Sequence, residues 1–511
     1  MAEATVGDTR KCSGAVDEHV QRGEGTPLLT STNVSTGAPL AREDWEESSH
    51  SLVSLTATTG SNRIIRGALL CSIALIVICI ACTGTANVSP WEEPSTFSMI
   101  VASLVGPTST TTGPQNPSTT GGHIPPYPAI ARDDFGPLRE YSVVHTDRSL
   151  NLMSEPFQHV MRDLNLILTE TYNAEKVAII PGSGTYGMEA VARQYAAGKH
   201  VMVLVNGYFS YRWVEIFDVG QIPASHRVLN AGPISSPETD SNKQKQYQPH
   251  PVAKVIGHIK EERPAVLFAA HVETSTGIML PDDYIRQVSA AVHDVGGLFV
   301  LDCIASGTVW VDMKELGIDV LITAPQKGWS GEPCAAMVQM SEAAVRMLDE
   351  KRDTSFSVSL KRWTAVMDAY VAGGYAYHTT PPTDSLRVLQ ELSVEMLQFG
   401  IPELKQAQLG MGTRARDVFD SKGLVSVSAP GFQAPGVLVY YSPDNTDNQT
   451  MMALFKQHGL QIASGVPWMI GEPHGLKTFR IGLFGLDKLE NIDQTVLILS
   501  KAVDNVLAAL L

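Results

Sequence analysis

The chain has 511 residues, of which 44% are hydrophobic and 18% charged, and this balance is ordinary for a folded protein with room for two domains. The formal net charge of −15 provides no basic stripe that could neutralise phosphates, so the composition argues against a nucleic-acid partner. The six cysteines have neither the spacing of a disulfide framework nor that of a zinc site, and we expect no metal.

The first 133 residues divide into three segments by composition. Residues 1–62 are polar and have no sustained apolar period, so we expect a disordered leader. Residues 64–86 form an apolar run, and after Arg66 no charged residue occurs until Glu92, which predicts one transmembrane helix. A buried core helix or the core of a cleaved signal is the alternative. Residues 87–133 are dense in Pro, Ser, Thr and Gly, as in a flexible tether.

The charges that flank the apolar run predict its orientation. Arg63 and Arg66 stand immediately before it, whereas Glu92 and Glu93 are the first charges after it. Because positive charges favour the cytosolic side, we expect a single-pass protein with its N-terminus in the cytosol and its larger part on the other side. Cleavage of the leader and targeting of the remainder to an organelle is the alternative.

Beyond about residue 134, short buried-strand runs alternate with amphipathic helices. One such helix is expected at residues 281–295, which begin with a Pro-Asp-Asp cap signal. This alternation predicts an α/β domain with a mainly parallel sheet. The strand runs are VAII (Val177–Ile180), VMVLV (Val201–Val205), AVLFAAH (Ala265–His271), GLFVLD (Gly297–Asp302) and IDVLIT (Ile318–Thr323).

A glycine-rich turn, PGSGTYG, follows the first of these runs. Gly182 and Gly184 permit a tight turn, and Ser183 and Thr185 offer hydroxyl groups. A helix that begins near Tyr186 would direct its N-terminal amides at the same place, which suits a phosphate. The turn lacks the Lys of a nucleotide P-loop and the full dinucleotide fingerprint, so ATP and NAD are poor candidates. An ordinary glycine turn is the alternative.

Two charged residues follow later runs. Asp302 ends GLFVLD, and Lys327 follows IDVLIT in the stretch TAPQKGWSG. If the two strands are near neighbours, both side chains project into one crevice at the carboxyl ends of the strands. Poor solvation there would lower the pKa of the Lys327 amine and suit it to act as a nucleophile. Taken singly, a surface lysine in a turn and an aspartate that caps a helix are the alternatives.

The two charged residues and the glycine turn together fit one kind of cofactor. This is an aldehyde that carries a pyridine nitrogen and a phosphate. Lys327 would bond to the aldehyde carbon, Asp302 would keep the pyridine nitrogen protonated, and the turn around Ser183 would hold the phosphate.

The chain from Tyr141 to Leu511 resembles the class V, fold-type I pyridoxal-phosphate aminotransferases, particularly the alanine–glyoxylate and serine–pyruvate aminotransferase group. The resemblance implies a pyridoxal-phosphate-binding large domain over residues 134–395, a smaller C-terminal α/β domain over residues 396–511, and a homodimer. Seven stretches carry it, in the family's order: PGSGTYGMEA, NGYFSYRW, HVETSTGIMLP, LDCIASG, APQKGWSG, HTTPPTDSLRVLQE and FRIGLFG.

Carried over residue by residue, the resemblance makes Lys327 the Schiff-base lysine and Asp302 the partner of the pyridine nitrogen. Arg480 matches the arginine that grips the substrate α-carboxylate with two parallel hydrogen bonds. The other implied cofactor contacts are Ser183, Gly184, Thr185 and Gln326 at the phosphate, Phe209 over the ring where many relatives have Trp, Thr274 near the phenolic oxygen, Ile304 on the other ring face, and Thr379 or Thr380 at the phosphate of a neighbouring subunit.

The reaction that the resemblance implies is ping-pong transamination from a small amino acid to a keto acid such as glyoxylate or pyruvate. A 2-aminoethylphosphonate transaminase and a lyase of the same superfamily are the alternatives. A cysteine desulfurase would need a cysteine on a mobile loop, and Cys334 is the only cysteine downstream of Lys327. A membrane-tethered interaction protein with a degenerate enzyme-like domain is a further alternative, against which the retention of Lys327 and Asp302 argues.

Overall fold

The structure is a computed structural model that describes residues 131–132, 136–137, 139–234, 244–348, 353–444 and 446–510. The expected leader (1–62), the expected membrane span (64–86) and almost all of the expected tether (87–133) lie outside these residues. Within the described ranges, no helix combines the length and the apolar character that a membrane crossing requires. The first long described range, residues 139–234, begins close to residue 134, where the sequence predicts the start of the α/β part.

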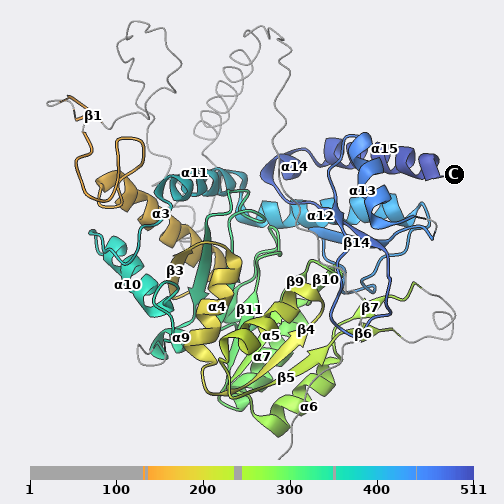
Figure 1. The fold of residues 1–511 in the computed structure, drawn as a ribbon, viewed down its shortest axis with the longest axis horizontal. Helices are drawn as coiled ribbons and strands as arrows, with labels where there is room; N and C mark the ends of the chain where they lie inside the picture. Colours follow the sequence, from red (N-terminus) through yellow and green to blue (C-terminus); the bar gives the residue numbers. More distant parts are fainter. Residues whose placement is uncertain are drawn as a thin grey trace, which may run out of the picture. The chain divides into compact units, whose positions relative to one another are not determined.

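A seven-stranded sheet forms the centre of the fold, in the order β3-β13-β12-β11-β8-β4-β5 (Figure 1). Only β13 runs antiparallel to its neighbours, so the mainly parallel sheet expected from the sequence is confirmed. The strands are β3 (Lys176–Pro181), β4 (His200–Val205), β5 (Ser225–Asn230), β8 (Val266–Ala270), β11 (Leu298–Asp302), β12 (Val320–Thr323) and β13 (Ala335–Met340).

Five of these strands coincide with the five apolar runs in the sequence. The two that the sequence reading missed are β5 and β13. The β5 strand lies at an edge of the sheet and is largely polar and solvent-exposed, so it presents no continuous apolar run. The β13 strand is buried throughout, but its sequence AAMVQM contains a glutamine and little of the Val, Ile and Leu that marks the other strands.

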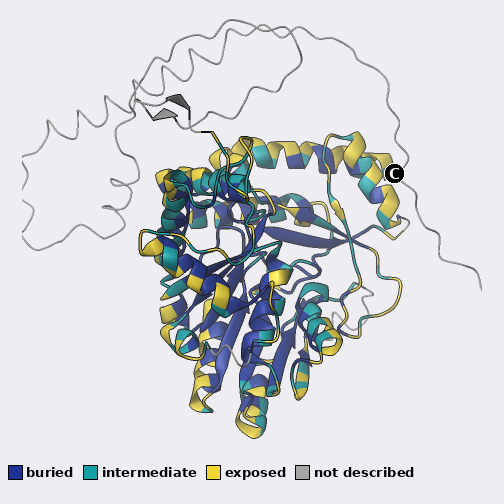
Figure 2. Ribbon diagram, turned by 60° about the vertical axis from the view of Figure 1, so that its left-hand side comes forward, coloured by how far each residue is buried: buried dark blue, intermediate teal, exposed yellow. Residues whose placement is uncertain are grey.

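Helices pack against this sheet and expose their outer faces, while the strands between them are buried (Figure 2). The α4 helix packs against β12 and β13, α5 packs against β4 and β8, and α7 packs against β11. The helices that accompany the sheet are α3 (Glu155–Tyr172), α4 (Gly184–Tyr195), α5 (Tyr208–Gly220), α6 (Val252–Glu262), α7 (Asp282–Asp294), α8 (Met313–Leu316), α9 (Glu342–Arg346), α10 (Leu360–Val371) and α11 (Thr383–Phe399).

A second, antiparallel sheet forms the C-terminal part, in the order β14-β16-β15. Its strands are β14 (Val437–Tyr441), β15 (Ala463–Ser464) and β16 (Thr478–Gly482), accompanied by α12 (Ile401–Asp420), α13 (Asn448–Gln457), α14 (Leu486–Glu490) and α15 (Ile492–Leu510). The short strands β1 (Ala131–Arg132) and β2 (Gly136–Pro137), β6 (Gly232–Pro233) and β7 (Tyr247–Gln248), and β9 (Val272–Glu273) and β10 (Ile278–Met279) pair two by two. The division into a large and a small domain remains a prediction.

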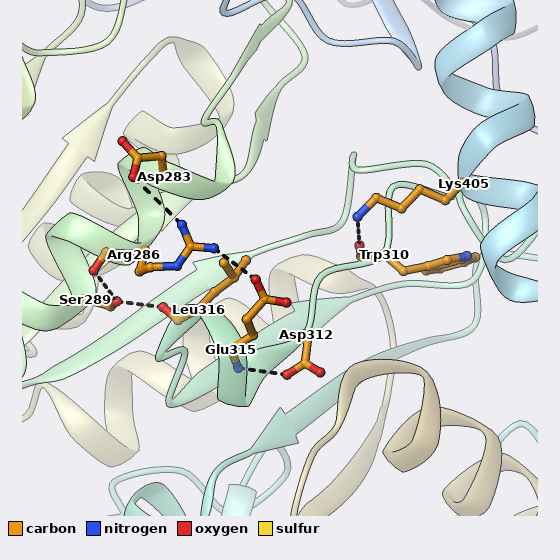
Figure 3. A network of polar contacts seen from close by, with 8 residues as sticks. All are labelled: Asp283, Arg286, Ser289, Trp310, Asp312, Glu315, Leu316 and Lys405. Atoms are coloured by element: carbon orange, nitrogen blue, oxygen red, sulfur yellow. Dashed lines mark hydrogen bonds and ion pairs between the residues drawn. The ribbon is translucent and has the colours of Figure 1, made fainter. Parts of the chain in front are cut away.

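The connection between β11 and β12, residues 303–319, is anchored by polar contacts to α7 and α12. It contains the single-turn helix α8, whose last carbonyl accepts a hydrogen bond from a buried serine of α7. Asp302 precedes this connection, and Lys327 follows β12. Figure 3 shows the polar contacts of the connection: Ser289 Oγ to Leu316 O (2.6 Å), Arg286 Nη2 to Glu315 Oε1 (2.9 Å), Glu315 N to Asp312 Oδ1 (2.9 Å) and Lys405 Nζ to Trp310 O (2.9 Å).

Candidate active site

Asp302 and Lys327 meet at one cavity at the carboxyl edge of the central sheet. The β11 and β12 strands are parallel neighbours, with Asp302 aligned to Ile322, so the adjacency that the sequence only suggested is present. The cavity has a volume of about 180 Å³ and is lined by Ser183, Gly184, Thr185, Met188, Phe209, Arg212, Val272, Thr274, Asp302, Ile304, Ala305, Gln326 and Lys327. A larger cavity of about 490 Å³ lies beside β16, and none of the expected site residues lines it.

The Lys327 amine lies in an environment that disfavours its charge. Its Nζ atom is 5.9 Å from the ring centroid of Phe209 and 5.7 Å from that of Phe484. Burial lowers the pKa of the amine, against the opposing influence of the Asp302 and Glu273 carboxylates. A neutral, nucleophilic amine is therefore more accessible here than on a surface lysine.

Asp302 is buried at the last position of β11. Burial raises the pKa of its carboxyl to about 6, although a hydrogen bond from Ile304 N to Oδ1 (2.9 Å) and the charge of Lys327 both lower it. No helix begins at this point, since the next one, α8, starts at Met313, so Asp302 caps no helix. A buried carboxylate of this kind gains from any cationic N–H group that is brought against it.

The N-terminus of α4 also lines the cavity. This helix begins at Gly184, two residues before the start expected from the sequence, and the side chain of its N-cap, Ser183, makes no capping hydrogen bond. Gly182 has φ of 126°, which favours glycine, and a Cβ atom on Gly184 would lie 2.3 Å from Cδ1 of Ile304. The turn thus exposes helix amides and a hydroxyl to the cavity with no side chain to block them.

Gln326 supplies a second polar group near this end. Its Oε1 atom is buried and has no hydrogen-bond partner among the described residues. The side-chain NH2 group of Gln326 and the unblocked helix terminus of α4 can both donate hydrogen bonds to a bound phosphate, which the acceptor Oε1 cannot do. With the Lys327 amine and the Asp302 carboxylate at the same cavity, these residues fit pyridoxal phosphate.

Phe209 lies near the start of α5 and reaches the cavity with its ring. The arrangement depends on Glu273, a fully buried carboxylate that the sequence reading did not single out. Its two oxygens accept hydrogen bonds from Phe209 N (3.2 Å) and Ser210 N (2.8 Å), and its Oε1 also accepts one from Ser275 N (2.9 Å). Glu273 therefore holds the first turn of α5, and with it the Phe209 ring, against the end of β9.

Arg212 and Phe484 are two further residues that the sequence reading did not single out. The Nη1 atom of Arg212 donates a hydrogen bond to Thr185 Oγ1 (3.0 Å), and its Cζ lies 5.2 Å from the centroid of the Phe209 ring. Arg212 lies in NGYFSYRW and Phe484 in FRIGLFG, two of the stretches that carry the resemblance. Their presence in these stretches is the sequence feature that could have identified them as site residues. Nothing in their own spacing marks them.

Arg480 approaches the same aromatic ring from β16 of the C-terminal sheet. Its Cζ is 5.7 Å from the Phe209 centroid, and its Nε donates a hydrogen bond to Ser464 O (2.7 Å). Burial lowers the pKa of the guanidinium, and Glu273 opposes this effect. The position fits a group that binds a substrate carboxylate beside a ring-shaped cofactor.

The remaining expected residues divide into two groups. Thr274 and Ile304 line the cavity, and their expected contacts with the cofactor remain predictions. Thr379 and Thr380 do not line it, and the Thr380 hydroxyl lies 3.2 Å from that of Tyr377 at an exposed position. Their expected place at the phosphate of a neighbouring subunit remains a prediction.

No protein-family model matches the chain. The chain is 26% identical over 349 residues to alanine–glyoxylate aminotransferase 1 of Saccharomyces cerevisiae, which covers 65% of this chain and 83% of that protein. It is also 26% identical to the 2-aminoethylphosphonate–pyruvate transaminase of Pseudomonas putida, covering 60% of this chain and 77% of that one.

A solved structure, that of alanine–glyoxylate aminotransferase from Nostoc sp., superposes with a TM-score of 0.58 at 21% identity, over 69% of this chain and 89% of that one. This likeness establishes the fold. The sequence relatives and the fold agree with the resemblance found in the sequence, since the chain is similar to alanine–glyoxylate and related class V aminotransferases.

Proposed function

We propose that the chain is a pyridoxal-phosphate-dependent transaminase that moves an amino group from a small amino acid to a keto acid, such as glyoxylate or pyruvate, by a ping-pong mechanism. One observation carries the proposal. A buried carboxylate and a poorly solvated amine, Asp302 and Lys327, meet at one cavity from neighbouring parallel strands, and an unblocked helix N-terminus lines the same cavity. Lone surface residues would not share these features.

Each residue then has a defined task. When bound, the cofactor supplies an electron-withdrawing ring that makes the substrate Cα–H acidic. The Asp302 carboxylate keeps a proton on the pyridine nitrogen, and the Phe209 ring covers one face of the cavity. Arg480 holds the substrate α-carboxylate by two hydrogen bonds, which orients the Cα–H bond for cleavage. Lys327 would hold the cofactor through its amine and, as a neutral amine, would serve as the base that moves the proton from the substrate Cα.

Transamination itself is tested with purified chain and pyridoxal phosphate. Alanine, serine and aspartate serve as donors and glyoxylate or pyruvate as acceptors, and both products of each half-reaction are measured. The proposal expects a keto acid in one half-reaction and a new amino acid in the other, with no turnover in Lys327→Ala. Product formation by that variant, or the absence of any amino-group transfer in the wild type, would contradict it.

A 2-aminoethylphosphonate transaminase is the second candidate, because one of the relatives carries that name. This donor has no carboxylate, so Arg480 would face a phosphonate instead. Competition between 2-aminoethylphosphonate and alanine for the same enzyme decides between the two. A cysteine desulfurase is disfavoured because Cys334 is buried, and burial raises the pKa of its thiol to about 11, which leaves little thiolate at neutral pH.

The proposed active form is a homodimer. The loop that carries Thr379 and Thr380 exposes two aromatic side chains, Tyr375 (49%) and Tyr377 (60%), which is costly unless another surface covers them. Mixing Lys327→Ala chains with Thr379→Ala, Thr380→Ala double-variant chains tests the shared site. Partial recovery of activity in the mixture supports a site built from two chains, and no recovery opposes it.

The membrane span at residues 64–86 and the cytosolic N-terminus remain part of the proposal. They are supported by the uncharged run after Arg66 and by the arginines that precede it. Protease treatment of sealed vesicles decides the matter. Protection of the catalytic part without detergent supports the orientation, whereas its digestion on a full-length, membrane-bound chain overturns it. Processing to a shorter soluble chain would instead support the organellar alternative.

A further inference from the structure

We propose that Arg212 is the cationic partner of the cofactor phosphate, completing the anion site at the N-terminus of α4. The inference rests on the proposed function and deepens it. It starts from charge, since a phosphate monoester carries about −1.5 to −2 at pH 7. The contacts expected from the sequence, Ser183, Gly184, Thr185 and Gln326, are all neutral, and a helix N-terminus supplies only about half a positive charge.

The position of Arg212 meets this need. It lines the same cavity as Ser183 and Gln326, and Lys327 is the only other cation among the described residues that line it. Lys327 is expected to bond to the aldehyde carbon, so its amine is committed to that bond rather than to the phosphate. Arg212 is thus the fixed positive charge available at the α4 end.

The hydrogen bond between Arg212 and Thr185 prepares this end for an anion. Arg212 Nη1 donates to Thr185 Oγ1 at 3.0 Å. Because a hydroxyl can accept one bond and still donate its own proton, the arginine turns Thr185 into a donor toward the cavity. A guanidinium has five N–H groups, so those not used on Thr185 can bind phosphate oxygens directly.

Among the described residues, no carboxylate neutralises the charge of Arg212. It makes no ion pair with any carboxylate in the described parts of the chain. By contrast, Arg193 on α4 forms an ion pair with Glu189 at 2.7 Å. Stacking of the guanidinium on the Phe209 ring, 5.2 Å from the centroid, keeps it in place without neutralising it.

The alternative role for Arg212 is to hold Phe209 and Thr185 in position without contacting an anion. The two roles differ in how they depend on the phosphate group. A phosphate partner affects the binding of pyridoxal 5′-phosphate and leaves that of pyridoxal, which has no phosphate, nearly unchanged. A purely positioning residue affects both ligands to the same degree.

The experiment measures the equilibrium binding of both ligands to the cofactor-free wild type, Arg212→Met, Arg212→Lys and the control Arg193→Met. We expect Arg212→Met to weaken pyridoxal 5′-phosphate binding by roughly 10- to 100-fold, as for one charge-assisted hydrogen-bonded contact, with less than about a threefold change for pyridoxal. The affinity of Arg212→Lys for pyridoxal 5′-phosphate should lie between those of the wild type and Arg212→Met, because lysine keeps the charge but not the planar set of N–H donors. Arg193→Met should match the wild type.

Inorganic phosphate provides a readout that does not involve the aldehyde or activity. It should compete with pyridoxal 5′-phosphate on the wild type and on Arg193→Met, and compete much more weakly on Arg212→Met. Equal losses for pyridoxal and its phosphate, or undiminished phosphate competition in both Arg212 variants, would overturn the inference. A wild type that binds neither ligand at Lys327 would instead refute the proposed function, so the two failures are distinguishable.

Discussion

Replacing Asp302 with asparagine should stabilise the cofactor-free chain above pH 6 while it removes most of the turnover. In the folded chain the Asp302 carboxyl is buried, and burial raises its pKa from 3.8 to about 6. Asparagine keeps the size of the side chain and the oxygen that accepts the hydrogen bond from Ile304 N, but it has no charge to bury. The substitution therefore removes a cost of folding without opening a cavity.

The two pKa values fix the size and the pH range of this effect. Because the folded chain binds the proton more tightly than the unfolded chain, the carboxyl opposes folding increasingly as pH rises from about 4 to about 6, and by a constant amount above that. A tenfold difference in proton affinity corresponds to about 1.4 kcal/mol, so Asp302→Asn should gain at most about 3 kcal/mol at pH 8 and about half of that at pH 5.

Urea unfolding of the cofactor-free chains at both pH values measures the gain. Asp319→Asn is the matched control, since Asp319 is also buried beside the sheet but accepts hydrogen bonds from His293 Nε2 (2.8 Å) and Phe299 N (2.8 Å). That variant should lose roughly 1–3 kcal/mol, because it leaves buried donors without a charged acceptor. If Asp302→Asn is destabilised in the same way, or keeps near wild-type turnover, Asp302 serves the fold and the reasoning fails.

Three further substitutions test the site. Arg480→Ala should raise KM for amino acids with little change in cofactor affinity, and an equal loss for an amine without a carboxylate would show that Arg480 acts through the fold. Glu273→Gln should cost about 1–3 kcal/mol in the free energy of unfolding, because its amide group faces backbone N–H donors, and a melting temperature equal to that of the wild type would contradict the clamp on α5. Gly184→Ala should weaken cofactor binding, because its Cβ would overlap Ile304 Cδ1. The control Gly257→Ala on α6, with open space around it, should bind the cofactor normally and gain up to about 1 kcal/mol of stability. Equal cofactor affinity in the two alanine variants would show that the turn has room for a Cβ atom.

The parts of the site that could be predicted from sequence lie at the ends of buried parallel strands. Such strands appear as continuous apolar runs, and the residues directly after them, Ser183, Asp302 and Lys327, must emerge at the same edge of the sheet. The edge strand β5 was not predicted because it is largely polar and solvent-exposed. Sequence could also not show that β11 and β12 are neighbours, since strand order depends on contacts between distant segments.

The residues that were missed show a second limit. Glu273 and Arg212 lie within stretches that carry the resemblance, yet the sequence alone does not reveal whether a charged residue is buried or solvated. Only the fold shows that Glu273 binds the start of α5, and that Arg212 reaches Thr185 on a different helix. Likewise, Arg480 on β16 approaches the ring of Phe209 on α5. This contact links segments far apart in the chain, so no short sequence pattern predicts it.

The central claim is that Lys327 carries the cofactor covalently, with Asp302 and the α4 terminus around it. The direct measurement is borohydride reduction of the chain after incubation with pyridoxal phosphate, followed by mass mapping of its peptides. We predict that the reduced cofactor is found at near-stoichiometric yield on Lys327, and that the label is lost in Lys327→Ala. Labelling spread over surface lysines, or unchanged in Lys327→Ala, would contradict the account.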